Sequence, residues 1–240
     1  MNEAVFKEIL REGLAPWGVS LTGSQEELMI AFAKELILAN QRMNLTAITD
    51  WKEMAVKHML DSLSAALAVD LEEGMEVLDV GSGGGLPGIP LKIFQPGLAL
   101  TLMEASRKKA EFLEAACQHL FDDGFQVVWS RAEDAGQGPL RESFKLVLAR
   151  AVASLRVLSE YCLPFAEVGG LFLALKGPDG PKELQEAQDA IEVLGGRVEK
   201  TIPVVLPGEA GERLLILIRK TKRTPEKYPR RAGMPQKRPL

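Results

Sequence analysis

A glycine-dense turn directly after a short apolar run is the feature that most restricts how this chain can fold. Residues 77–80 read VLDV, and residues 81–91 read GSGGGLPGIPL. Residues without a Cβ allow tight turns and let a backbone lie close to a ligand. Free amide groups at the start of the following helix favour an anionic group there. The pattern therefore predicts a buried strand, a ligand-binding loop and a helix, in that order.

Short apolar runs alternate with helical patterns from residue 74 to residue 220. The strand-length runs cover residues 75–80, 98–103, 125–129, 144–148, 171–175, 202–206 and 214–218. Most are uninterrupted, which is typical of strands buried on both faces of a mostly parallel sheet. Helical patterns cover residues 107–120, 155–167 and 182–194. No helical pattern separates the last two runs, so we expect an antiparallel hairpin at the end of a doubly wound α/β sheet.

The first 70 residues carry helical rather than strand-like apolar spacing, and they predict an N-terminal helical cap over residues 1–70. Ser24 and Glu27 have the spacing of a capping box for the second helix. Asp50 is placed to cap the third. We expect a Rossmann-like domain over residues 71–220 to follow this cap.

The charge is distributed unevenly along the chain. The formal net charge is −4, yet nine Lys or Arg and a single acid lie between Arg219 and Leu240. Four prolines also fall in this segment, so residues 221–240 are predicted to be a basic, proline-rich tail that cannot fold alone. An acidic body with a basic tail indicates a polyanionic partner that binds at one place.

Two kinds of cofactor remain compatible with the glycine loop. A dinucleotide-binding fingerprint can be drawn through Gly83, Gly85 and Gly88, with Glu104 21 residues beyond the first of them. The glycines begin at Gly81, however, two residues after an acid within the strand. That arrangement resembles the E/D-x-G-x-G-x-G motif of Rossmann-like methyltransferases that use S-adenosylmethionine. In those enzymes the loop receives the methionine moiety, and an acid in the place of Glu104 holds the ribose hydroxyls.

The segment after the third strand supports the methyltransferase interpretation. Residues 130–134 read SRAED, and methyltransferases often use an acidic side chain and the preceding backbone amide here to recognise the adenine amino edge. A matched donor and acceptor reject other bases, because mismatched buried polar groups cost about 1 to 3 kcal/mol. Ala132 and Glu133 are the candidates for this contact.

The segment after the fourth strand restricts which atom can accept the methyl group. Residues 148–154 read LARAVAS and lack the Asn/Asp-Pro-Pro-aromatic box that is usual in enzymes that methylate exocyclic amines. Methylation of cytosine C5 needs a cysteine nucleophile, but Cys162 lies inside a predicted helix. An atom with an exposed lone pair remains, such as guanine N7, and Arg150 is expected close to both cofactor and base.

Several further motifs resemble the bacterial RsmG (GidB) family. They are NLTAIT at residues 44–49, KHMLDSL at 57–63, the glycine loop, ARA at 149–151, LKG at 175–177 and YPRRAGMP at 228–235. That family methylates guanine N7 in the 530 loop of 16S ribosomal RNA. The resemblance implies a guanine-N7 methyltransferase that uses S-adenosylmethionine and takes 16S ribosomal RNA or the small ribosomal subunit as its partner.

The resemblance also implies roles for individual residues. The expected cofactor contacts are Gly81, Gly83, Gly85, Leu86, Glu104, Ala105, Ser106, Ala132, Glu133 and Arg150. Arg150 and His58 are the candidates for catalysis. Residues expected to face the pocket or the RNA are Asn44, Asp61, Ser62, Lys176, Arg230 and Arg231.

Other expectations concern what the chain lacks. No apolar stretch approaches the roughly 18 residues of a membrane span, and no secretory signal opens the chain, so we expect a cytoplasmic protein. Two Cys and two His without ligand spacing predict no metal site. We expect a monomer whose Trp17, Trp51 and Trp129 fill the core or an interdomain seam. The alternatives are an NAD-dependent oxidoreductase, or a non-catalytic RNA-binding factor in ribosome assembly.

Overall fold

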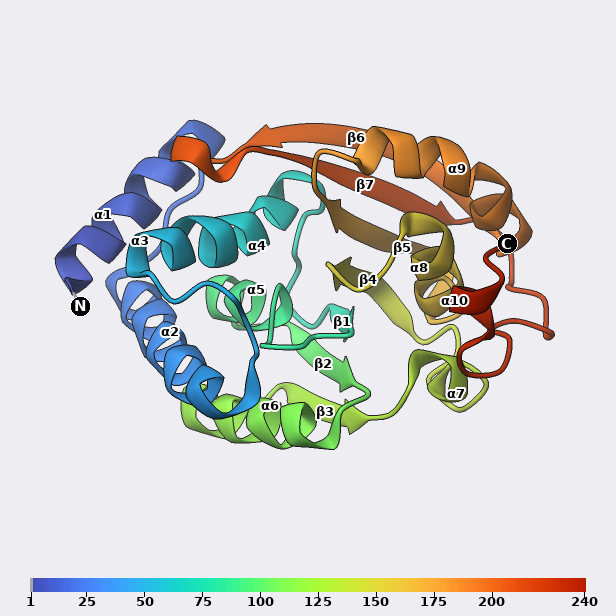
Figure 1. Ribbon diagram of the computed structural model, residues 1–240, viewed down its shortest axis with the longest axis horizontal. Helices are drawn as coiled ribbons and strands as arrows, with labels where there is room; N and C mark the ends of the chain where they lie inside the picture. The colour runs from blue at the N-terminus through green and yellow to red at the C-terminus, as the bar shows by residue number, and fades with distance from the viewer. Residues whose placement is uncertain (1) are drawn as a thin grey trace.

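A seven-stranded sheet forms the centre of the computed structural model, which describes residues 2–240 apart from the side chain of Glu209 (Figure 1). The strand order is β3-β2-β1-β4-β5-β7-β6. The strands are β1 (Glu76–Val80), β2 (Ala99–Glu104), β3 (Phe125–Trp129), β4 (Phe144–Arg150), β5 (Ala166–Lys176), β6 (Gly196–Val205) and β7 (Glu212–Lys220). Strands β1 to β5 pair in parallel, and β7 lies antiparallel to both β5 and β6. The predicted fold class and the terminal hairpin are confirmed.

Alternate residues of each central strand enter two different cores, because successive side chains of a strand point to opposite faces. In β1, Val77 belongs to one core and Leu78 to the other. In β7, Leu217 and Ile218 divide in the same way. Burial on both faces explains why these strands read as continuous apolar runs.

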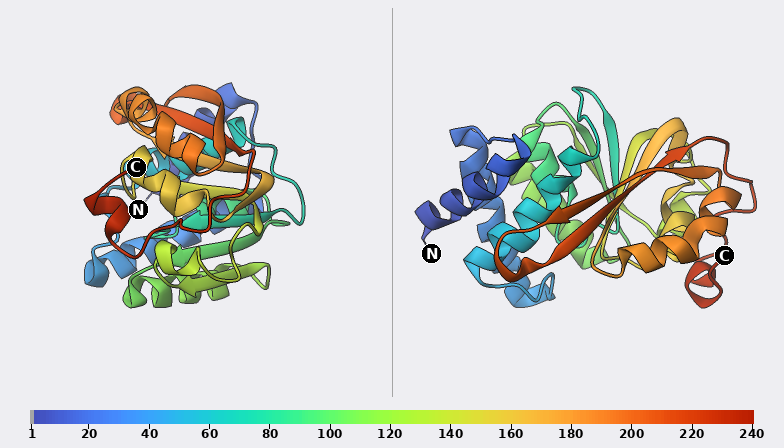
Figure 2. Two further views of the ribbon diagram at one scale, coloured as in Figure 1. Left: turned by 90° about the vertical axis from the view of Figure 1, so that its right-hand side faces the viewer. Right: turned by 90° about the horizontal axis from the view of Figure 1, so that it is seen from above.

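Helices cover both faces of the sheet (Figure 2). One core joins the sheet to α5 and α6 and to the N-terminal helices, and the other joins it to α8, α9 and the C-terminal segment. The first layer contains α1 (Glu3–Leu14), η1 (Ala15–Trp17), α2 (Gly23–Met43), α3 (Trp51–Met54), η2 (Ala55–Leu60), α4 (Asp61–Leu63), η3 (Ser64–Leu67), α5 (Gly88–Phe94) and α6 (Arg107–Leu120). The remaining elements are α7 (Ala132–Ala135), α8 (Leu155–Cys162), α9 (Gly180–Val193), η4 (Gly208–Ala210) and α10 (Met234–Lys237).

The N-terminal segment is helical, as its apolar spacing predicts. Asp50 caps α3 by accepting hydrogen bonds from the amides of Lys52 and Glu53. The capping box of α2 is shifted from its predicted place, because Thr22 is the N-cap and Gln25 reciprocates. The third predicted helix contains a π-helical turn, η2, between α3 and α4.

One predicted helix was too long. The pattern over residues 155–167 predicts a single helix, but α8 ends at Cys162 and β5 begins at Ala166. Pro164 lies between them, and a proline has no backbone N–H with which to continue the hydrogen bonds of the helix. Ala166 instead pairs with Phe144 of β4.

The basic tail packs against the body of the protein. Tyr228 is 7% exposed, and Arg141 donates to the carbonyl groups of Thr224 and Tyr228, both at 2.7 Å. Arg156 donates to the carbonyl groups of Pro239 and Leu240. Within residues 2–240, no helix has the length and apolar character to cross a membrane. Nor do these residues contain a cluster of three or more His, Cys, Asp or Glu that could hold a metal ion.

Candidate active site

The loop after β1 takes backbone conformations that require glycine. Gly81, Gly83 and Gly85 have φ angles of 72°, 56° and 87°, in the left-handed region that side chains with a Cβ disfavour. A Cβ on Gly81 would also lie 2.7 Å from the side chain of Val152. At Gly83, by contrast, the nearest atom to an added Cβ would be a backbone oxygen 3.8 Å away. The loop therefore has open space at Gly83 that suits a closely approaching ligand.

Glu104 closes the same loop from the end of β2. Its Oε2 accepts a hydrogen bond from the amide of Gly83 at 3.0 Å, and its Oε1 accepts one from the amide of Ser106 at 2.8 Å. The side chain is 8% exposed. A carboxylate can accept about four hydrogen bonds, so Glu104 keeps acceptor sites for ligand hydroxyl groups while it holds the loop.

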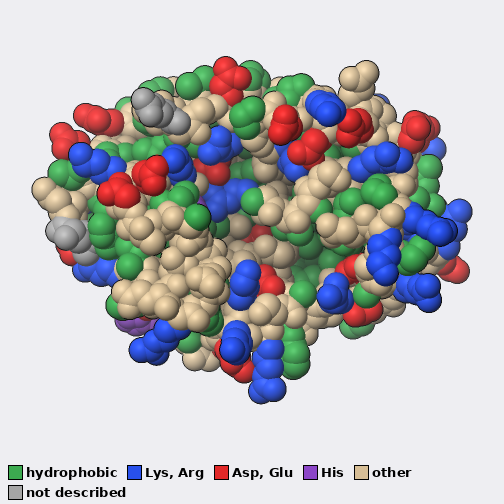
Figure 3. All heavy atoms as spheres, viewed as in Figure 1, with side chains coloured by type: hydrophobic (Ala, Val, Ile, Leu, Met, Phe, Trp, Pro, Cys, Tyr) green, Lys and Arg blue, Asp and Glu red, His purple; other side chains and the backbone are tan. Residues whose placement is uncertain are grey.

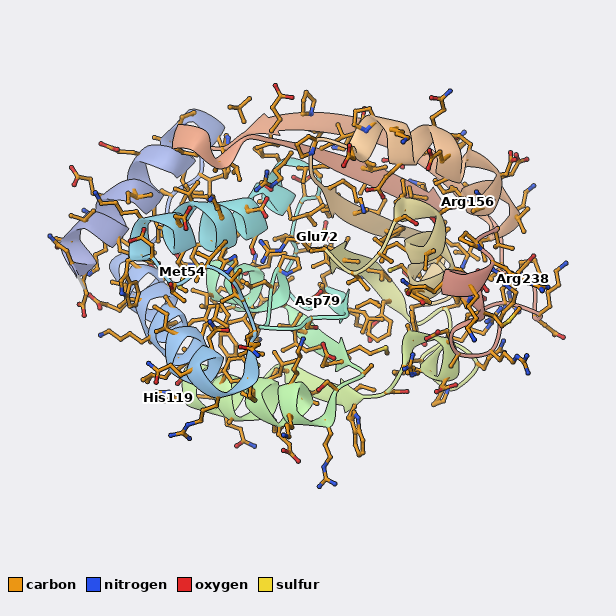
Figure 4. The ribbon with its side chains drawn as sticks, viewed as in Figure 1. Met54, Glu72, Asp79, His119, Arg156 and Arg238 are labelled. Atoms are coloured by element: carbon orange, nitrogen blue, oxygen red, sulfur yellow. The ribbon has the colours of Figure 1, made fainter. Side chains whose placement is uncertain are left out.

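Asp79 lies beneath the loop, near the middle of the molecule (Figure 4). Its Oδ2 accepts a hydrogen bond from the amide of Gly88 at 3.0 Å, which links β1 to the start of α5. Its Oδ1 has no hydrogen-bond partner among the described residues. Burial raises the pKa of the Asp79 carboxyl to about 7, against the lowering effects of the Gly88 amide and the Arg150 guanidinium. Asp79 is 0% exposed and does not line the cavity described next, so it supports the glycine loop from inside the protein.

A cavity of about 440 Å³ connects these elements. Gly81, Gly83, Leu86, Glu104 and Ala105 line it, together with His58 and Arg150. Leu45 and Thr46, from the segment between α2 and α3, form its N-terminal wall. On the face seen in Figure 3, basic side chains border a hollow near the centre. The cavity has the size of a small-molecule site.

His58 holds the wall of this cavity through both ring nitrogens. Nδ1 donates to the carbonyl group of Lys57 at 3.1 Å, and Nε2 accepts from the hydroxyl group of Thr46 at 2.7 Å. The Thr46 hydroxyl in turn accepts from the amide of Ile48 at 3.0 Å. Burial, and to a smaller extent the positive charge of Arg150, lower the pKa of His58 to about 4. The imidazole is therefore neutral at pH 7, and its lone pair is already engaged.

Arg150 ends β4 and is fixed by the N-terminal helices. Its Nη1 donates to Oδ2 of Asp61 at 2.8 Å and to the carbonyl group of Lys57 at 3.2 Å. The other carboxylate oxygen of Asp61 accepts from Nε of Arg213 on β7 at 3.0 Å. Asp61 is 5% exposed and so joins the cap, β4 and the hairpin in one buried ion-pair network. Nε and Nη2 of Arg150 make no hydrogen bond within the described residues, which leaves donors for a ligand.

Other predicted site residues lie outside the cavity wall. Gly85 packs against α5 and α6, because an added Cβ would meet Ile89 and Leu113. Ser106 is exposed and contributes its amide to Glu104. Asn44 is the exposed left-handed C-cap of α2. The hydroxyl group of Ser62 is buried without a hydrogen-bond partner in the described part of the chain.

The remaining candidates are engaged by other parts of the fold. Glu133 is 4% exposed and accepts a hydrogen bond from the amide of Gly233 at 2.8 Å, and its neighbour Ala132 begins α7. Lys176 pairs with Glu183 at 2.8 Å. The predicted RNA contact Arg230 pairs with Glu160 at 2.6 Å, whereas Arg231 is exposed. Their assignment to cofactor or substrate stays a prediction.

Several residues of the site carry no sequence signal of their own. Arg213 lies in an apolar strand far from the glycine loop in sequence, and only the antiparallel insertion of β7 brings it to Asp61. Lys109 lines the cavity from α6. Trp129, predicted to be internal, is 59% exposed, because β3 is the edge strand and its last residue has no neighbour on the outer side.

Comparison with known proteins decides between the families that use such a loop. Residues 25–210 match the family described as rRNA small subunit methyltransferase G, also designated GidB. A protein of that name from Pelotomaculum thermopropionicum is 49% identical over 238 residues, which cover 99% of this chain and all of that protein. Its namesake from Symbiobacterium thermophilum is 48% identical and covers the whole of both chains.

This chain belongs to the ribosomal RNA small subunit methyltransferase G family. The resemblance inferred from its motifs is thereby confirmed. Among solved structures, TYW2 from M. jannaschii, determined in complex with AdoMet, superposes with a TM-score of 0.52 at 13% identity. The superposition covers 65% of this chain and 72% of that one, and it supports the Rossmann-like methyltransferase fold. Membership of the family favours methyl transfer over hydride transfer as the use of the glycine loop.

Proposed function

We propose that this protein transfers a methyl group from S-adenosylmethionine to N7 of a guanine in the 530 loop of 16S ribosomal RNA. The transfer is a direct in-line attack that needs no general base. One observation carries the proposal: the cavity joins the glycine loop, Glu104 and Arg150, while its histidine is neutral and hydrogen bonded through both nitrogens. The site offers positioning and charge rather than proton transfer.

The residues present suit S-adenosylmethionine. When bound, this cofactor supplies a methyl group on a positively charged sulfur. The open space at Gly83 admits the methionine end, and the free acceptor sites of Glu104 take the ribose hydroxyls. Glu133, which accepts a hydrogen bond from the Gly233 amide, is the candidate for the adenine edge.

The acceptor atom follows from what the site can and cannot do. The in-plane lone pair of guanine N7 is free at neutral pH, so no proton has to leave before attack. Arg150 is held by Asp61 in a fixed orientation and directs its remaining donors into the cavity that the base must enter. Placing two reacting atoms in line at near-attack distance supplies about 7 to 11 kcal/mol. Cys162, a nucleophile by type, is fully buried and burial raises its thiol pKa, which disfavours covalent catalysis.

Transfer of a radiolabelled methyl group followed by nucleoside mapping tests this function. Naked 16S ribosomal RNA and isolated small subunits are offered separately, and label is expected on N7 of one guanine in the 530 loop. Label on another atom would contradict the N7 assignment. Binding without any label on either substrate would favour the non-catalytic assembly factor, and tighter calorimetric binding of NAD than of S-adenosylmethionine would favour the oxidoreductase.

The histidine variants test the mechanism. A histidine with a pKa of about 4 does not titrate between pH 6 and 8, so a flat rate over this range is expected with or without a base. His58→Asn is therefore the informative change, with His119→Asn, at the exposed second histidine, as its matched control. Under saturating RNA and cofactor, the single-turnover rate of His58→Asn should stay within about tenfold of the control, because a missing general base typically costs 10²- to 10⁴-fold. A larger loss at saturation would contradict base-free transfer.

A further inference from the structure

We propose that Trp129 is a stacking platform for an unpaired RNA base next to the target guanine, and that the cations around it hold the adjoining phosphates. This inference rests on the proposed methylation of guanine N7. It extends the substrate site from the cavity to the outer edge of the sheet.

The indole of Trp129 is exposed but fixed in orientation. Trp129 ends β3, where it pairs in register with Glu104 of β2. Trp129 is 59% exposed, whereas Trp51 is half-buried and makes an edge-to-face contact with Phe6. The indole Nε1 donates to the carbonyl group of Ala105 at 3.1 Å, and Ala105 lines the cavity. The ring therefore stands at the cavity rim without depending on a ligand for its orientation.

Arg107 occupies one side of the ring. Its guanidinium carbon lies 5.4 Å from the indole centroid, a cation–π distance. Glu111, one helical turn further along α6, accepts from Nε of Arg107 at 2.9 Å and holds it there. With one face covered and the residue more than half exposed, the opposite face is available for a planar partner. A preorganised aromatic surface loses little conformational entropy when a partner binds.

The charge around the ring suits a phosphate backbone. Lys108 and Arg131 are exposed, and Lys109 lines the cavity itself. Within residues 2–240, none of these three side chains has a carboxylate at ion-pair distance, whereas Arg107 is paired with Glu111. Basic side chains follow the lower edge of the face in Figure 3, the side on which α6 and β3 lie in Figure 1. An exposed aromatic ring among unpaired cations is the arrangement that binds single-stranded nucleic acid.

The proposed reaction requires an unpaired substrate. In an A-form RNA helix the major groove is deep and narrow, and protein side chains cannot reach the base edges there. Guanine N7 lies on that edge, so the guanine must leave the helix to enter the cavity. Its neighbours then lose their stacking partners, and an aromatic ring beside the entrance replaces one of them. Stacking tolerates any base, so this platform recognises an unpaired strand rather than a sequence.

Binding and fluorescence measurements on the full chain test the platform. Trp129→Ala should weaken binding to naked 16S ribosomal RNA or isolated small subunits by about 5- to 150-fold, the usual effect of losing one aromatic–base stack. Trp129→Phe keeps a ring and should bind within about fivefold of the wild type, while it loses the RNA-induced quenching of tryptophan fluorescence. Val205→Ala, at a 72% exposed residue of the hairpin, is the matched control and should bind as the wild type does.

The other possible results each contradict either the platform or the proposed function. Unchanged RNA affinity in Trp129→Ala would overturn the platform, even while the wild type methylates its guanine. A Phe variant as weak as the Ala variant would show that the hydrogen bond to Ala105, not stacking, is what matters, and would also overturn it. A loss of S-adenosylmethionine affinity alone would make Trp129 part of the cofactor wall instead. A wild-type protein that binds RNA through Trp129 but labels no guanine would refute the proposed function and leave the platform standing.

Discussion

Replacing Asp79 by asparagine should remove a pH-dependent destabilisation of the folded state. Burial raises the pKa of this carboxyl from 3.8 to about 7. Between these values the folded protein binds more protons than the unfolded chain, so the stability of the wild type falls as the pH rises. Each pH unit in this window corresponds to about 1.4 kcal/mol, or about 4 kcal/mol over the whole window. Between pH 5 and pH 7 the wild type should therefore lose about 2.3 kcal/mol relative to Asp79→Asn, and the remaining loss of about 0.4 kcal/mol should be nearly complete by pH 8.

Urea unfolding of both proteins at unit steps from pH 5 to pH 8 measures this difference. In Asp79→Asn, the side-chain NH2 group would find no hydrogen-bond acceptor at the present position of Oδ1. This changes the free energy of unfolding by an amount that does not vary with pH. Only the slope of the free energy of unfolding against pH is therefore informative. Asp189→Asn, at an exposed residue of α9, is the control and should give a curve parallel to the wild type. A parallel curve for Asp79→Asn would refute the reasoning, because it would mean that the Gly88 amide and Arg150 outweigh burial and keep the carboxyl ionised.

Three further changes have expected outcomes. Asp61→Asn should lower the free energy of unfolding, measured in urea titration, by about 3 kcal/mol. The guanidinium groups of Arg150 and Arg213, which are 12% and 18% exposed, would lose their carboxylate partner. A change below about 1 kcal/mol would contradict the network. Glu104→Gln should weaken calorimetric binding of S-adenosylmethionine by at least about tenfold, since hydrogen bonds to a charged acceptor contribute roughly 1.5 to 3 kcal/mol each; unchanged affinity would remove Glu104 from the site. Replacing the exposed Lys222, Lys227, Lys237 and Arg238 together by glutamine should reduce the slope of log RNA affinity against log salt by up to about 3, if the tail contacts single-stranded RNA; an unchanged slope would show that the tail does not dock the RNA.

Local pattern alone predicted much of the sheet and its helices. The bounds of β3 and α6 match the predicted ranges, because a continuous apolar run and a 3.6-residue period are both local signals. The insertion of β7 between β5 and β6 was beyond prediction, since strand order depends on pairing between distant segments. The π-helical turn η2 was also missed. It places His58 against Thr46, a contact that the apolar spacing of the segment does not encode.

Residues that are close in the sheet were predicted to lie together, and they do line one cavity, while their role in binding a cofactor stays a prediction. Gly81, Leu86 and Glu104 meet in one cavity because the ends of β1 and β2 are adjacent in a parallel sheet. The hydrogen-bond partners of Glu133 and Arg230 lie 100 and 70 residues away in sequence, so no local pattern indicates these contacts. The exposure of Trp129 depends on β3 being an edge strand, and a list of apolar residues does not say which strand lies at the edge.

The basic tail shows how a charge count differs from a binding surface. Nine cations fall between Arg219 and Leu240, but Arg219 pairs with Glu199, Lys220 is fully buried near Glu142, and Arg230 pairs with Glu160. Lys220 donates to the carbonyl groups of Leu163 and Ala166 and to the hydroxyl group of Thr224. Arg219 and Lys220 belong to β7, but Lys220 through Thr224 and Arg230 through Glu160 hold the tail on the body, so deleting the tail would disturb folding and RNA binding together. Point substitutions at the exposed cations separate the two effects, and for that reason they, rather than a truncation, measure what the tail contributes to the RNA.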